Sequence, residues 1–136
     1  MTRVYLDSSA VIKRVVPEPE SSALVDALEA HHAQGDLLVS SSLAWVEIAR
    51  ALSRRDPGRS IRAAMEVEVA LSGVAEYPIV PEVVSLARRV GPDGLRSLDA
   101  IHLASAVLVD ADLVVTYDER LATACADMRL AVACPT

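Results

Sequence analysis

Phenylalanine is absent from this chain of 136 residues, which also has only one tryptophan and three tyrosines. With so few aromatic side chains, the core must be built from valine, leucine, isoleucine and alanine, which is typical of helices that cover a parallel sheet. No apolar run reaches the length of about 18 residues that a transmembrane helix needs. The first residues also lack the basic and then apolar layout of a signal peptide. We therefore expect a cytoplasmic protein without a membrane segment.

Cysteine and lysine are scarce as well. The two cysteines, Cys125 and Cys134, lack the spacing of metal ligands, so each is predicted to be a small, reduced core residue. Of the 13 basic residues only Lys13 is a lysine. Arginine is the better bidentate partner for phosphate, although codon usage in a GC-rich genome explains this ratio equally well. The net charge of −6 argues against broad binding to a phosphate backbone, but a metal ion can supply local positive charge to a nuclease.

Strand and helix patterns alternate along the chain, which has the length and composition of one globular domain over residues 1–136. The predicted strands are 3–6, 37–40, 74–80, 112–116 and 130–133. The predicted helices are 8–16, 23–33, 42–54, 60–71, 82–90, 98–107 and 118–126. This alternation predicts an α/β fold with a central, mainly parallel sheet of four or five strands flanked by helices.

Three aspartates stand where a predicted helix begins. Asp7 and Asp118 each follow a strand, and Asp99 comes two residues after Ser97, the predicted cap of a nearly all-apolar helix. Each has a purely structural explanation, because aspartate caps helices and a negative charge suits the positive end of the helix dipole. However, ligands bind at the carboxyl ends of the strands in an open parallel sheet. We therefore also expect the three side chains to converge at that edge.

Such a cluster needs compensation, because its members repel one another. Two unit charges about 4 Å apart repel by roughly 4 kcal/mol at an effective dielectric constant of about 20. A helix cap contributes only about 1 kcal/mol, too little to offset several such repulsions. Either the carboxyl groups hold protons through raised pKa values, or a divalent cation neutralises them. Oxygen ligands without histidine or cysteine favour Mg²⁺ or Mn²⁺.

Two further titratable residues lie among apolar neighbours. Glu47 is in the middle of a predicted helix, and a buried glutamate is rare unless it is paired. The alternative is an exposed glutamate that pairs with Arg50 or Arg54 along one helix face. His102 comes one turn after Asp99, and we interpret it as a satisfied core histidine rather than a metal ligand.

Four blocks of the sequence resemble the acidic blocks of PIN-domain ribonucleases, and in particular VapC, the toxin half of bacterial VapBC toxin–antitoxin pairs. In chain order they are Leu6–Ala10, the helix with Glu47, Leu98–Ala106 and Thr116–Leu121. Each block alone is a weak signal, but all four in this order and spacing are specific. The resemblance extends from Val4 to about Val132.

The resemblance implies a PIN-like fold and an acidic quartet that binds Mg²⁺ or Mn²⁺, formed by Asp7, Glu47, Asp99 and Asp118. Ser8 matches the small hydroxyl residue after the first aspartate, and Thr116 matches the hydroxyl residue that supports the last acid. Asp118 departs from the pattern, because it lies two residues beyond the end of its strand. Its contact with metal, direct or through water, is therefore left open.

The activity implied by this resemblance is that of a metal-dependent endoribonuclease toxin that hydrolyses RNA phosphodiester bonds. It also implies a VapB-type antitoxin as partner and a homodimer. A non-catalytic module of the same fold, which keeps the acids for metal or partner binding, is the alternative. Arg50, Arg54 and Arg96 are candidates for binding substrate phosphate, although an ordinary exposed face also explains the first two.

Overall fold

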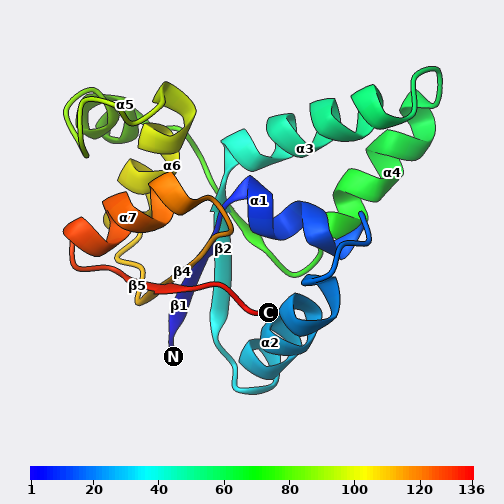
Figure 1. Cartoon of the computed structure of the whole chain (residues 1–136), viewed down its shortest axis with the longest axis horizontal. Helices are drawn as coiled ribbons and strands as arrows, with labels where there is room; N and C mark the ends of the chain where they lie inside the picture. The colour runs from blue at the N-terminus through cyan, green and yellow to red at the C-terminus, as the bar shows by residue number, and fades with distance from the viewer.

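The structure, a computed structural model, describes all 136 residues. Its centre is a five-stranded sheet in which every pair of neighbouring strands is parallel. The strands are β1 (Arg3–Leu6), β2 (Leu37–Ser41), β3 (Ala75–Tyr77), β4 (Leu113–Val115) and β5 (Ala131–Ala133). They are ordered β3-β2-β1-β4-β5, so β1 lies in the middle (Figure 1). The predicted parallel α/β fold is confirmed.

Helical segments connect the strands. They are α1 (Ser8–Val11), the 3₁₀ helix η1 (Ile12–Arg14), α2 (Ser21–Ala33), α3 (Ser42–Arg55), α4 (Ser60–Ala70), α5 (Pro81–Ala87), α6 (Ser97–Leu108) and α7 (Glu119–Asp127). Helices α3 and α4 form a hairpin that projects from the sheet (Figure 1). None of these helices has the length and apolar character needed to cross a membrane.

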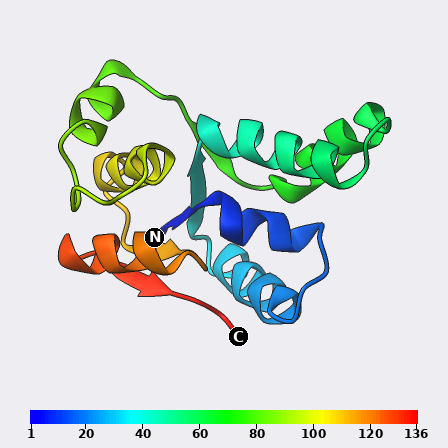
Figure 2. The ribbon, with the colours of Figure 1, turned by 45° about the horizontal axis from the view of Figure 1, so that its top comes forward.

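Helices cover both faces of the sheet, because successive side chains of a strand point to opposite sides. Val4 and Leu6 belong to a buried cluster with residues of α1, α2, α3 and α4. Tyr5 and Val114 belong to a second cluster with residues of α6 and α7. Figure 2 shows these two groups of helices on opposite sides of the strands. The sheet is therefore buried between two helical layers.

The first helix is shorter than the predicted range 8–16. It is α-helical only to Val11 and then tightens into the 3₁₀ turn Ile12–Arg14. The physical reason is Pro17, which disfavours helical geometry at Val16 and leaves too little chain for another α-helical turn.

Two boundaries near α5 and α6 also differ from the prediction. Helix α5 ends at Ala87 within the predicted range 82–90, because the chain turns toward Gly91, whose positive φ of 78° ends helical geometry. The N-cap of α6 is Arg96 rather than Ser97, and no side chain caps this helix. The first amides of α6 are therefore left without a side-chain cap beside Asp99.

The two cysteines lie in different environments. Both are reduced, and Cys125 is fully buried in α7, as predicted. The prediction of a core position is wrong for Cys134, which is exposed. It lies directly after β5, where the chain leaves the sheet.

Candidate active site

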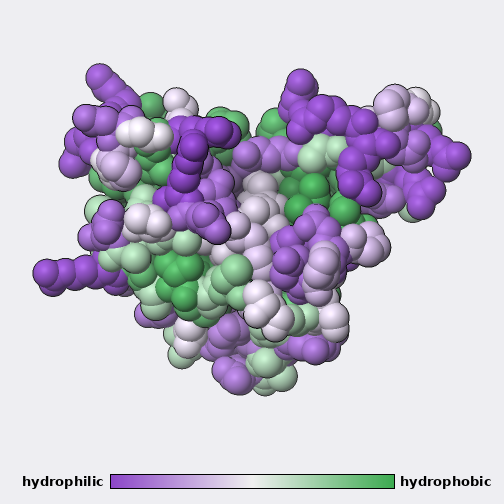
Figure 3. Space-filling model, in the orientation of Figure 1, coloured by the Kyte–Doolittle hydropathy of each residue, from purple (hydrophilic) through white to green (hydrophobic).

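The parallel sheet brings the four predicted acids toward its carboxyl edge. They are Asp7 after β1, Glu47 on α3 after β2, Asp99 in the first turn of α6 and Asp118 after β4. In the space-filling view, the outline of the molecule is notched between the α5–α6 lobe and the α3–α4 hairpin (Figure 3). Polar residues dominate the surface of both lobes beside this notch.

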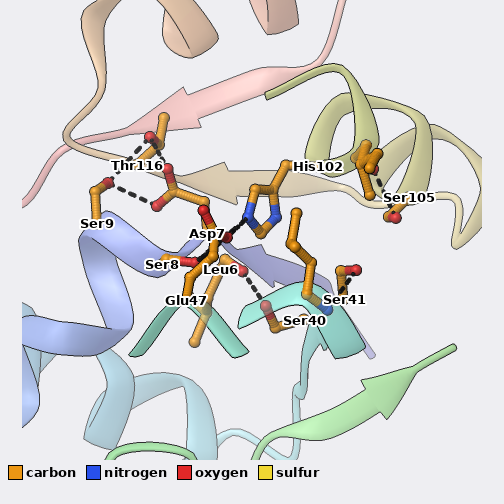
Figure 4. A network of polar contacts seen from close by, with 12 residues as sticks. Leu6, Asp7, Ser8, Ser9, Ser40, Ser41, Glu47, His102, Ser105 and Thr116 are labelled. Atoms are coloured by element: carbon orange, nitrogen blue, oxygen red, sulfur yellow. Dashed lines mark hydrogen bonds and ion pairs between the residues drawn. The ribbon is translucent and has the colours of Figure 1, made fainter. Parts of the chain in front are cut away.

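Asp7 is the most firmly held of the four. Its Oδ1 accepts hydrogen bonds from Ser9 Oγ at 2.7 Å and from the Ala10 amide at 3.1 Å. Its Oδ2 accepts one from Thr116 Oγ1 at 2.6 Å (Figure 4). Burial raises the pKa of Asp7 above its usual value of 3.8, although these hydrogen bonds and the charge of His102 act in the opposite direction. The predicted N-cap role is confirmed, because Asp7 caps α1.

Thr116 links two of the acids. Besides donating to Asp7, its Oγ1 accepts a hydrogen bond from the Asp118 amide at 3.0 Å. Asp118 Oδ1 in turn accepts from the Leu121 amide at 3.0 Å and so caps α7, as predicted. Thr116 is therefore positioned to orient Asp7 as well as Asp118.

Glu47 reaches across to α6 instead of along its own helix. Its Oε1 is 2.6 Å from His102 Nε2 and accepts a hydrogen bond from Ser8 Oγ, also at 2.6 Å. Burial raises the pKa of Glu47, but the hydrogen bonds from His102 and Ser8 outweigh that effect and lower it below 4.5 overall. The alternative of an exposed pair with Arg50 or Arg54 is wrong.

His102 is a satisfied buried histidine, as predicted, but its partners include a site residue. Its side chain is only 3% exposed, and Nε2 faces Glu47. The other ring nitrogen, Nδ1, lies 2.6 Å from the hydroxyl of Tyr5. Burial raises the pKa of Tyr5, so its hydroxyl keeps its proton and can donate.

Asp99 is half-buried, and its carboxylate has no hydrogen-bond or ion-pair partner within the protein. Burial raises its pKa above 3.8, and the charges of Asp118, Asp7 and Glu47 raise it further, while His102 opposes them. These charges act on Asp99 because the four acids share one region. Together with Asp118 it lines an open pocket of about 310 Å³ without a single hydrophobic residue.

The donor set fits a hard divalent cation, since the four acids offer only oxygen ligands. Asp99 is free to bind, and Asp118 and Glu47 each keep one carboxylate oxygen without a hydrogen bond. No group of three or more acidic, histidine or cysteine side chains stands close enough to hold an ion together. That arrangement still suits Mg²⁺, which is usually bound by one or two carboxylates and keeps several waters.

Comparisons with known proteins identify the family of this chain. The PIN domain profile matches residues 4–126. The ribonuclease VapC46 of Mycobacterium tuberculosis is 41% identical over 138 residues, which cover 100% of both chains. VapC47 of the same organism is 38% identical over 135 residues, covering 97% of this chain and 96% of the relative. This chain belongs to the PIN-domain family of VapC ribonucleases.

Solved VapC structures share the fold at low sequence identity. VapBC2 from Rickettsia felis, bound to a DNA fragment from its promoter, has a TM-score of 0.72 at 13% identity and covers 97% of this chain and 98% of its own. VapC20 of Mycobacterium tuberculosis, described as a sarcin-ricin loop cleaving toxin, has a TM-score of 0.67 at 15% identity. It covers 89% of this chain and 94% of its own.

The arginines proposed from the sequence fall in two places of the VapC fold. Arg50 and Arg54 are exposed on α3. Arg96 lines the polar pocket beside Asp99. A further arginine that sequence reasoning missed, Arg120, lines the same pocket from the first turn of α7. Its position two residues after Asp118 is the signal that would have found it.

Two other contributors to the site were missed. Ser9 donates to Asp7 and also accepts a hydrogen bond from the Tyr117 amide at 2.9 Å, so it joins the two strand ends. Its place two residues after Asp7, in a helix that Asp7 caps, is the local signal for this contact. Tyr5 has no such local signal, because its partner His102 is 97 residues away in the sequence.

Proposed function

We propose that this protein is a Mg²⁺- or Mn²⁺-dependent endoribonuclease that acts as the toxin of a toxin–antitoxin pair. The observation that carries the proposal is the unpartnered carboxylate of Asp99, whose pKa is raised by burial and by three neighbouring acids. Such repulsion has no structural benefit, but a cation bound there would turn it into attraction. Membership of a family whose curated relatives are named ribonucleases supports the same reaction.

In this proposal, Asp7, Glu47, Asp99 and Asp118 hold the metal, directly or through water. A bound divalent ion lowers the pKa of a coordinated water and neutralises charge on the phosphate. A carboxylate, with Glu47 and Asp118 as the candidates, would take the proton of the attacking water, and the lowered pKa of Glu47 keeps it ionised near neutral pH. Ser8 and Thr116 hold Glu47 and Asp7 in orientation through hydrogen bonds of 2.6 Å.

Arg96 and Arg120 bind the RNA phosphate beside the acids in this proposal. Both line the pocket with Asp99 and Asp118, and neither guanidinium forms an ion pair within the protein. Guanidinium groups match phosphate oxygens bidentately, so two free ones next to a metal site suit a phosphodiester. Arg50 and Arg54, exposed on α3 in the other lobe, contact more distant parts of the RNA backbone in this proposal.

A VapB-type antitoxin and a second copy of the chain are the proposed protein partners, with the cytoplasm as the compartment. Neighbouring folds include VapBC complexes and a toxin–antitoxin complex from Klebsiella pneumoniae. Helix α4 also exposes an apolar stripe of Ile61, Met65 and Val69, which are 80%, 67% and 60% exposed and line an open pocket of about 530 Å³. Contiguous exposed apolar surface of this kind marks a protein-binding site.

The deciding experiment measures cleavage of RNA by purified protein with Mg²⁺, with Mn²⁺ and with EDTA. We expect cleavage with either ion and none with EDTA. Asp7→Asn and Asp99→Asn should each lower the rate on the order of 100-fold or more, because each removes a metal ligand. Asp26→Asn, which neutralises an exposed acid on α2, is the matched control and should cleave normally. Protein that binds Mn²⁺ but cleaves no RNA would be the non-catalytic module instead.

A further inference from the structure

A buried chain of hydrogen bonds runs from the central strand to Glu47. The hydroxyl of Tyr5 on β1 is 2.6 Å from Nδ1 of His102, and Nε2 of the same ring is 2.6 Å from Oε1 of Glu47. Tyr5 is 0% exposed and His102 is 3% exposed, so water does not compete for the contact between them, while the contact with Glu47 is partly buried. The two rings also meet edge to face, with centroids 5.9 Å apart. The imidazole is therefore held by Tyr5 at one nitrogen and by Glu47 at the other.

The direction of these hydrogen bonds follows from the chemistry of the groups. An ionised carboxylate can only accept, so the proton between His102 and Glu47 is on Nε2. In the neutral ring, Nδ1 then has a free lone pair and accepts from the hydroxyl of Tyr5, whereas in the protonated ring Nδ1 donates to that hydroxyl. In both forms Nε2 donates to Glu47, and Tyr5 holds the ring through Nδ1.

The two oxygens of the Glu47 carboxylate are therefore bound unequally. Ser8 Oγ also donates to Oε1, so both hydrogen bonds fall on one oxygen and Oε2 receives none. Figure 4 shows Ser8 and His102 converging on Glu47 beside Asp7. The side chain of Glu47 is 26% exposed, so without these donors water would solvate it in many orientations. With these donors, Oε1 is fixed and Oε2 stays free of hydrogen bonds within the protein.

We propose that His102, held by Tyr5, is a positioning residue that fixes Glu47 so that its Oε2 serves the metal site. This inference rests on the proposed function, because it assigns a purpose to the free oxygen of Glu47. Neither His102 nor Tyr5 touches the substrate. Their effect passes entirely through Glu47.

The first test compares kcat and KM for RNA cleavage in three variants. His102→Leu, which removes the donor, should lower kcat by about 10- to 100-fold, as is usual when a partner of a metal ligand is lost. KM should stay within about twofold of that of the wild type, because the substrate contacts are intact. His102→Gln keeps an N–H at similar reach and should recover most of kcat. Tyr5→Phe should lower kcat several-fold.

A control and a double-variant cycle separate positioning from general loss of structure. Leu103→Val perturbs the adjacent buried position of α6 without touching Glu47, and should leave kcat unchanged. In a Glu47→Gln background, His102→Leu should cause no further loss, because the group it positions is gone. Equal losses from His102→Leu in both backgrounds, or no rescue by His102→Gln, would overturn the proposal.

The same double-variant cycle can be measured without RNA, through the Mn²⁺ affinity of each variant in electron paramagnetic resonance. This measurement does not depend on cleavage. His102→Leu should weaken Mn²⁺ binding about 10-fold in the wild-type background and not in Glu47→Gln. A wild-type protein that binds Mn²⁺ but cleaves no RNA would refute the ribonuclease, while the affinity cycle would still decide the role of His102. A wild type that binds no Mn²⁺ would refute both proposals.

Discussion

The four acids at the carboxyl edge of the sheet are held to very different degrees. Asp7 accepts hydrogen bonds at both oxygens, whereas Glu47 and Asp118 accept them at one oxygen each. Asp99 accepts none. Hydrogen bonds therefore fix three of the carboxylates. Asp99 has none, and burial together with the negative charges of the other three raises its pKa. A substitution of Asp99 therefore tests both this repulsion, through protein stability, and the proposed metal role, through RNA cleavage.

Replacing Asp99 should stabilise the metal-free protein while it abolishes cleavage. A carboxyl group with a raised folded pKa destabilises the fold when ionised, so Asp99→Asn should raise the free energy of unfolding at pH 7. Since Asp99 is half-exposed, solvent screening limits the gain to about 0.5 kcal/mol. Urea unfolding in EDTA provides the measurement, with Asp26→Asn as control. A lower free energy of unfolding for Asp99→Asn than for the wild type would contradict the claim that Asp99 is repelled by its neighbours.

The pH dependence of that gain has a definite sign. Folded Asp99 binds a proton more tightly than the unfolded chain, so the metal-free wild type recovers stability as pH falls through the raised pKa toward 3.8. The advantage of Asp99→Asn should therefore be largest at neutral pH and shrink as pH falls through that window. Unfolding series at several pH values between 7 and 4 would show it. An advantage that grows on acidification would exclude this explanation.

Local chemistry predicted part of the site, and the rest depends on pairing between distant segments. Asp7 and Asp118 cap helices as their positions after strands indicated, because a cap is set by neighbouring residues. The partner of Glu47 was not predictable in this way. His102 is 55 residues further along the chain, and the meeting of α3 with α6 depends on the strand order.

Lys13 shows how one buried charge joins two helical segments. Its ammonium group lies 2.5 Å from Glu18 and 3.2 Å from Glu20, and 4.5 Å from the ring centroid of Tyr117. It thus ties η1 to the start of α2. Burial lowers the pKa of Lys13, but the two carboxylates outweigh it and raise the pKa overall.

Removing the acids should therefore harm the protein more than removing the lysine. The double variant Glu18→Gln, Glu20→Gln leaves a buried ammonium without counter-charge and should lower the free energy of unfolding by about 2–3 kcal/mol. Lys13→Met leaves only two partly exposed carboxylates and should change it by less than about 1 kcal/mol. Chemical denaturation of the two variants tests this order. The reverse order would mean that the ion pairs themselves stabilise the segment.

The connection between α5 and α6 contains a glycine, Gly91, that combines a left-handed backbone conformation with close side-chain neighbours. Gly91 has φ of 78°, and a Cβ built there would lie 2.8 Å from Leu95 Cδ2 and 3.4 Å from Leu103 Cδ2. Gly58 has a similar φ of 86° with open space around it. The two glycines thus share backbone strain but differ in steric crowding.

We expect Gly91→Ala to lower the free energy of unfolding more than Gly58→Ala. Both substitutions incur the left-handed backbone penalty of about 1–2 kcal/mol, and Gly91→Ala in addition forces the side-chain end of Leu95 to shift next to Leu103 of α6. Thermal unfolding of the two variants gives the comparison directly. Equal losses would show that Leu95 moves aside without effect on α6.

Because all five strands are parallel, every carboxyl end of the sheet faces the same edge. The alternation of strands and helices predicted this arrangement, and with it the convergence of Asp7, Asp99 and Asp118, whereas Glu47 was added to them only by the family resemblance. The central place of β1 was not predictable from any single segment, since strand order is set by the packing of the whole chain. The outcome concentrates negative charge at one edge of a molecule whose net charge is already −6.

A divalent cation should therefore stabilise the whole molecule. A ligand that binds only the folded state at about 100 times its dissociation constant adds about 2.7 kcal/mol, which for a chain of this size raises the melting temperature by about 10 °C. We expect Mn²⁺ to produce such a shift in the wild type, a much smaller one in Asp99→Asn, and an undiminished one in Asp26→Asn. NaCl at matched ionic strength screens charge without entering the site and should give only a small shift. If NaCl stabilised the protein as much as Mn²⁺ does, screening of the net charge would explain the effect and the edge would hold no specific ion.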